Sequence, residues 1–108
     1  MRLTAIEIET ATPATNQIAD LTIARLIASA TDGDAQACYE LGVIWSTGGH
    51  GVDCDLIEAH QWFNLAAARG HQEAAWCRSD ISDEMTAREI AEAQRRARQW
   101  LGDHRKTT

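Results

Sequence analysis

Proline, paired cysteines and long apolar runs are all scarce in this chain of 108 residues. The single proline, Pro13, leaves the rest of the sequence without the residue that most strongly interrupts helices. No apolar run approaches the roughly 20 residues that a membrane-spanning helix requires, so we expect no membrane anchoring. Glu7 and Glu9 stand where a secretory signal would be apolar. These absences favour a helical cytoplasmic protein.

Cysteine usage and charge exclude further classes. Cys38, Cys54 and Cys77 are odd in number and have no paired spacing, which indicates reduced thiols in a reducing compartment. The net charge of −6 argues against nonspecific attraction of the whole chain to nucleic acid or to an anionic membrane. The sequence contains neither a phosphate-binding glycine motif nor two close pairs of zinc ligands. We therefore expect no cofactor and no bound metal.

The hydrophobic periodicity predicts an all-α fold of stacked antiparallel helix pairs. We expect five helices, near residues 17–30, 34–47, 55–69, 71–84 and 87–101. Asp55 is the expected N-cap of the third helix, with Glu58 as its capping-box partner, and Thr86 with Glu89 forms the same box before the last helix. Gly102 is expected to end that helix.

The ends of the chain differ from its centre. Residues 1–15 alternate apolar and polar side chains before a TATPAT run, which predicts a flexible arm or, alternatively, an extended segment that pairs with a partner chain. We expect the helical domain to cover residues 16–103 and a short tail to cover 104–108. A register of 37 positions relates Gly33 to Gly70, so a second, shorter unit begins at Gly70.

A run of residues from Leu41 to Gly70 carries a family resemblance. The positions concerned are Leu41-Gly42, Trp45, Gly48, Gly51-Val52, Asp55, Glu58-Ala59, Trp62-Phe63, Ala66-Ala67 and Gly70. In this order they resemble one Sel-one-like repeat, an α/α repeat related to the tetratricopeptide repeats. The resemblance implies a short α/α solenoid that binds proteins and has no catalytic activity.

The same resemblance implies where a partner would bind. In such repeats the first helix of each pair lines the concave surface, so five residues are candidates for a partner-binding groove: Gln36, Tyr39, Glu40, Val43 and Trp76. An aromatic and acidic groove is typical of sites that bind a peptide or a helix. In the alternative interpretation, Tyr39 and Trp76 pack between repeats. On α-helical periodicity, Ile57, Gln61, Asn64 and Ala68 should form the free face of the third helix.

Two other functions remain open at this stage. Cys54, just before a helix N-terminus, or the histidines of the chain could serve a small regulatory or sensor protein. The last helix carries Arg88, Arg95, Arg96 and Arg98, which could contact nucleic acid, although the acidic remainder of the chain opposes this. The apolar residues Leu21, Ile23, Leu26 and Ile27 suggest that the first helix could form a homodimer surface, because repeat proteins usually need about three stacked units.

Overall fold

The computed structural model describes residues 20–104, and every regular element in that part of the chain is helical. Residues 20–31 form a helical stretch, here called the N-terminal helical segment. The elements that follow are α2 (Ala35–Thr47), the 3₁₀ turn η1 (Gly49–Gly51), α3 (Leu56–Ala68), α4 (Gln72–Ser82) and α5 (Ala87–His104). The predicted all-α fold is therefore confirmed. The predicted arm, residues 1–15, and the tail after His104 lie outside the described residues.

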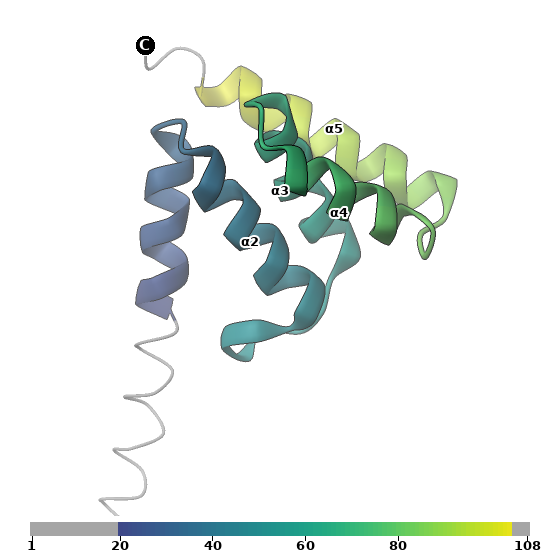
Figure 1. The fold of residues 1–108 in the computed structure, drawn as a ribbon, viewed down its shortest axis with the longest axis horizontal. Coiled ribbons are helices and arrows are strands. Elements are labelled where there is room, and N and C mark those ends of the chain that lie inside the picture. Colours follow the sequence, from purple (N-terminus) through teal and green to yellow (C-terminus); the bar gives the residue numbers. More distant parts are fainter. Residues whose placement is uncertain (1–19, 105–108) are drawn as a thin grey trace, which may run out of the picture.

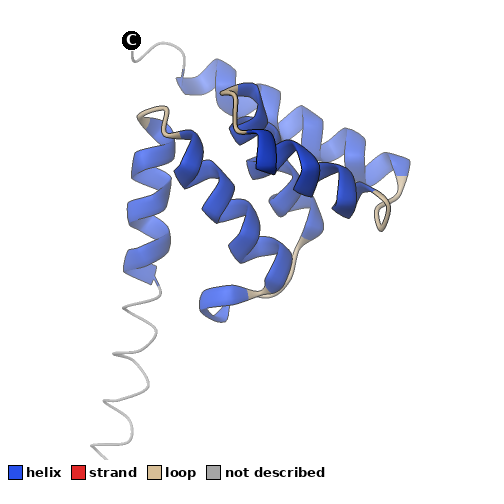
Figure 2. Cartoon of the chain, in the orientation of Figure 1, coloured by secondary structure: helices blue, strands red, loops and turns tan. Residues whose placement is uncertain are grey.

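The helices are arranged around α3, which contacts α2, α4 and α5. In Figure 1 the N-terminal helical segment and α2 lie on one side of the molecule, and α4 and α5 lie on the other. The loops between consecutive helices are short, as Figure 2 shows. Short connections make α2 and α4 neighbours of α3, whereas α5 packs on α3 rather than on α4, which precedes it.

Helices α2 and α3 approach each other closely at Gly42. A Cβ atom placed on Gly42 would lie 2.4 Å from Cε1 of Phe63, so only glycine admits the Phe63 ring here. The ring is one of the largest fully buried side chains, together with Leu41 and Leu65. The inward face of α2 includes the buried residues Ala37, Cys38, Leu41 and Ile44.

The helix α3 is buried over most of its circumference, as expected for a helix that is packed on more than one side. Its buried residues are Ala59, His60, Gln61, Trp62, Phe63, Leu65 and Ala66. The prediction that Gln61 belongs to a free face is wrong, because its exposed fraction is only 8%. Because three helices contact α3, less of its surface faces solvent than its sequence pattern predicts.

Hydrogen bonds of polar side chains contribute to the packing of α4 against α3. The ring of His60, which is 2% exposed, lies with its Nε2 atom 3.0 Å from Oγ of Ser82. That hydroxyl donates its proton to the carbonyl of Arg78 at 2.8 Å, so Nε2 of His60 must be the donor to Ser82. Arg78 in turn donates to Oδ1 of Asn64 at 2.7 Å. Neutral His60 is therefore built into the α3–α4 interface.

Helix starts follow the local sequence signals closely. Asp34 and Asp55 accept backbone N–H groups at the first turns of α2 and α3, as N-caps do. The capping-box role of Glu58 is wrong: its carboxylate instead accepts from Nε1 of Trp62 at 3.2 Å and lies 3.4 Å from Nη1 of Arg96. The backbone N–H of Asp55, which a capping box would pair with Glu58, donates instead to the carbonyl of Trp45 at 2.9 Å.

The second unit begins where the 37-residue register places it. Gly33 and Gly70 have φ values of +98° and +92° and precede the N-caps Asp34 and His71. The predicted box before α5 is confirmed by reciprocal hydrogen bonds between Thr86 and Glu89, at 2.9 and 3.1 Å.

The predicted end of the last helix is wrong, because α5 continues through Gly102 to His104. The His104 ring stacks on Trp100, with centroids 3.8 Å apart, and its Nδ1 atom donates to the Trp100 carbonyl at 2.9 Å. These contacts hold the final turn in helical form, and glycine at position 102 does not interrupt it.

Candidate partner-binding groove

Three of the five predicted partner-binding residues line one groove. Tyr39, Glu40 and Val43 project from α2 into a cavity of about 350 Å³ between α2 and the N-terminal helical segment. Four other residues complete the lining: Thr22, Leu26, Ile44 and His50. The groove therefore combines aliphatic side chains with one carboxylate, one hydroxyl, one phenol and one imidazole.

Tyr39 packs between the two units and also lines the groove. Its ring stacks on that of His71, with centroids 4.5 Å apart, and meets Phe63 at 6.0 Å. Burial, followed by the neighbouring Glu73 carboxylate and the Cys77 thiol, raises the pKa of its hydroxyl. The alternative interpretation, that Tyr39 is an inter-repeat packing residue, describes its ring correctly, so a substitution there would disturb the fold as well as the groove.

Gln36 orients Glu40 from the first turn of α2. Nδ1 of His71 accepts the backbone N–H of Ala74, which leaves the proton on Nε2 to be donated to Oε1 of Gln36 at 2.9 Å. The Gln36 amide nitrogen then donates to Oε2 of Glu40 at 3.2 Å. This chain of hydrogen bonds runs from the start of α4 to the carboxylate that lines the groove. Gln36 itself lies beside the groove and does not line it.

Trp76 does not line the groove. It lies on α4 with 63% of its surface exposed, so it is not a packing residue either. The predicted set of five thus divides into three groove residues, one residue that orients Glu40, and one exposed tryptophan on a neighbouring helix.

Arg69 links α3 to the N-terminal helical segment, which forms one side of the groove. From the end of α3, its Nη1 atom donates to the carbonyl of Ala30 at 3.0 Å and to Sγ of Cys38 at 3.2 Å. A cation at the last carbonyls of a helix is also favoured by the helix dipole. Burial raises the pKa of the Cys38 thiol, and Arg69 partly offsets this rise, so Cys38 is a buried neutral acceptor.

Some groove residues were not among the predicted partner-binding residues. Thr22 and Leu26 belong to the N-terminal helical segment, and His50 belongs to η1, in the turn between α2 and α3. His50 adopts a left-handed backbone conformation (φ 57°, ψ 28°), which is uncommon for a residue other than glycine. Of these residues, only Leu26 had a signal in the sequence, because it belongs to the apolar pattern that predicted a dimer surface.

The other two hypotheses, a sensor that uses Cys54 or the histidines and a nucleic-acid contact through α5, involve residues outside the groove, with the exception of His50. The exposed Cys54 thiol donates to the carbonyl of Ser46 at 3.3 Å. Among residues 20–104, no three histidine, cysteine or acidic side chains gather closely enough to hold a metal ion. On α5, Arg95 and Arg96 pair with Glu92 at 2.7 and 2.8 Å, which reduces the positive charge that this face presents to a polyanion.

Within residues 20–104, no helix is both long and apolar enough to cross a bilayer. Comparison of the chain with protein-family profiles, curated proteins and solved structures gives no match.

Proposed function

We propose that this chain is a non-catalytic protein-interaction module of the Sel-one-like type, which binds a peptide or helix of a partner protein in the groove between α2 and the N-terminal helical segment. The observation that carries this proposal is the convergence of Tyr39, Glu40 and Val43 on one preformed groove. The matched helix starts at Gly33 and Gly70 support the repeat assignment.

The shape and chemistry of the groove suggest what it binds. A cavity of about 350 Å³ is at the small end of ligand sites, and suits one or two side chains of a longer partner. Leu26, Val43 and Ile44 offer an apolar surface for such an anchor, while Glu40 offers a charge for a flanking donor. This division between an apolar anchor and a polar rim is typical of peptide-binding surfaces.

The experiment that tests the proposal compares partner capture by three proteins. Glu40→Lys reverses the charge in the groove, whereas Asp80→Lys makes the same change on the exposed surface of α4. We expect a partner captured from cell extract by the wild type to be retained by Asp80→Lys and to be lost from Glu40→Lys. Equal recovery by all three proteins would contradict the groove assignment. Tyr39 is avoided because its ring supports the fold.

The proposal includes a homodimer formed through the N-terminal helical segment. Leu21 and Ile27 are 60% and 37% exposed on the N-terminal helical segment, whereas Ile23 and Leu26 pack toward the core. A homodimer through this exposed pair would shift to monomer in Leu21→Glu, as measured by light scattering at high micromolar concentration.

All three cysteines are free thiols, which supports a cytoplasmic location.

A further inference from the structure

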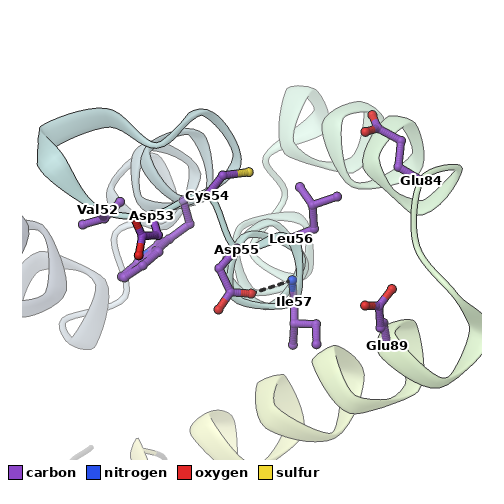
Figure 3. A pocket seen from close by; sticks show the side chains of 9 residues that line it. Val52, Asp53, Cys54, Asp55, Leu56, Ile57, Glu84 and Glu89 are labelled. Atoms are coloured by element: carbon purple, nitrogen blue, oxygen red, sulfur yellow. Dashed lines mark hydrogen bonds between the residues drawn. The ribbon is translucent and has the colours of Figure 1, made fainter.

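A second and larger cleft opens on the other side of η1 from the groove. Its volume is about 690 Å³, and it lies between the segment that leads into α3 and the connection from α4 to α5. Apolar side chains of Trp45, Leu56 and Ile57 line part of it. Figure 3 shows Leu56 and Ile57 between the residues of the turn and those of the α4–α5 connection.

Four carboxylates surround these apolar side chains. Asp55 accepts the backbone N–H groups of the first turn of α3, and Glu89 accepts that of Thr86. Asp53 and Glu84 also line the cleft, and no hydrogen bond or ion pair within residues 20–104 engages their carboxylates. Figure 3 shows Glu84 and Glu89 on one side of the cleft and Asp53 and Asp55 on the other.

The lining is unbalanced in charge. Lysine, arginine and histidine are all missing from the described residues that line the cleft, so nothing there neutralises the four carboxylates. The carboxylates also do not converge as metal ligands, because no group of three in the described chain is close enough to hold an ion. A ligand that complements this cleft must therefore carry several separate cations rather than one concentrated charge.

From this charge complementarity we infer that the cleft binds a basic segment of a partner protein, with an aliphatic side chain on Leu56 and Ile57 and arginine or lysine side chains toward Asp53 and Glu84.

The inference is tested by fluorescence anisotropy with a labelled twelve-residue peptide in which arginines flank a central leucine. We expect saturable binding to the wild-type protein that weakens when the salt concentration rises, because exposed charge pairs are screened. Two matched peptides complete the set: one replaces the leucine by serine, and the other replaces every arginine by glutamate. The first should bind several-fold more weakly than the parent peptide, and the second should not bind.

The protein variants separate this cleft from the acidic surface in general. Asp53→Asn with Glu84→Gln removes two charges from the cleft without touching a helix cap, so circular dichroism should be unchanged. Asp32→Asn with Asp80→Asn removes two exposed charges outside both the cleft and the groove and serves as the matched control. We expect about tenfold weaker binding in the first double variant and less than twofold in the second, as two exposed charge contacts would give.

Several results would overturn the inference. Equal weakening in both double variants would mean that the peptide responds to net charge alone. Equal affinity for the leucine and serine peptides would remove the role of the apolar side chains, and no binding at low salt would remove the site. A wild-type protein that oligomerises through this cleft, with dissociation in Asp53→Asn/Glu84→Gln and no competition by peptide, would assign the cleft to a second copy. Since neither double variant changes a residue that lines the groove, failure here is distinguishable from failure of the proposed groove.

Discussion

Helices α2 and α4 occupy equivalent places in the 37-residue register, yet different forces hold each of them against α3. The contact of α2 with α3 is apolar, with the Phe63 ring against the backbone of Gly42. In the second unit, α4 buries a single residue, Ala74, and hydrogen bonds link it to α3 through His60, Ser82 and Arg78. The connections that follow the two helices also differ, since a glycine turn leads from α2 to α3 and a capping box lies between α4 and α5.

This difference shows how two helices at equivalent places in one register can pack on the same helix by different means. Apolar packing at close range depends on shape and is insensitive to pH or salt. A buried hydrogen-bond network depends on every member being satisfied and on the neutral state of its histidine. We therefore expect the first unit to respond most strongly to changes in side-chain volume, and the second to respond to the loss of polar partners and to acid.

The largest effect is expected at the contact between α2 and α3. Gly42→Ala introduces a methyl group 2.4 Å from a carbon of the Phe63 ring, so the helices must separate or the ring must leave its rotamer. Overpacking of this kind costs about 3 kcal/mol of unfolding free energy. Urea denaturation followed by circular dichroism measures it. The exposed Thr47→Ala in the same helix should change the value by less than about 0.5 kcal/mol.

A second substitution makes this test specific. Phe63→Leu removes the ring atoms that Gly42→Ala meets, so the double variant should be more stable than the sum of the two single changes predicts. Strict additivity of the two changes would mean that the contact between Gly42 and Phe63 does not decide the approach of the helices.

The next effect concerns the polar interface of the second unit. Ser82→Ala removes the only described acceptor of the Nε2 proton of His60, and a buried donor without a partner costs about 2 kcal/mol. Ser79→Ala, on the exposed side of the same helix, is the matched control and should be close to neutral. Thermal unfolding measures both variants. A Ser82→Ala protein as stable as the control would show that His60 finds another acceptor.

How far the sequence predicted these contacts depends on their range. Helix caps at Asp55 and Thr86 were predictable because donor and acceptor lie within three residues of each other. The glycines at positions 33 and 70 were predictable as helix ends because the register repeats. Glu58, by contrast, was assigned to a local box and instead pairs with Arg96, which lies on another helix.

The candidate groove shows the same limit. Tyr39, Glu40 and Val43 were identified because the resemblance to an α/α repeat assigns this face of the first helix in a pair to the groove. Thr22 and Leu26 could not be identified, because their part in the groove depends on how the N-terminal helical segment lies against α2. Trp76 matched Tyr39 in the register, but α4 meets different neighbours from α2, so the equivalent position is exposed.

A smaller effect is expected at the connection that replaces the glycine turn in the second unit. Thr86→Ala removes the side chain that caps Glu89 N–H, which costs about 1 kcal/mol of stability. Thr86→Ser keeps the hydroxyl and should retain most of the wild-type value. Chemical denaturation of the three proteins measures the difference. If serine and alanine were equally destabilising, the methyl group rather than the hydroxyl would stabilise the turn.

The smallest effect is a loss of stability in mild acid that originates in the second unit. Burial, followed by the charge of Arg78, lowers the pKa of His60, so the folded protein keeps this ring neutral. An unfolded histidine titrates near pH 6.5, so below that pH the unfolded chain takes up a proton that the folded protein resists. Stability is therefore full above about pH 6.5 and falls as the pH drops toward the folded pKa.

The slope of stability against pH isolates this residue. From pH 7 to pH 6 the loss from His60 is at most about 0.7 kcal/mol, set by the unfolded histidine alone. His60→Gln retains an N–H donor for Ser82 but does not titrate, so its unfolding free energy should fall less over this range than that of the wild type. The other three histidines are common to both proteins and cancel in the comparison. Identical slopes would mean that His60 takes up its proton without disturbing the α3–α4 interface, and that the polar character of the second unit does not make it sensitive to acid.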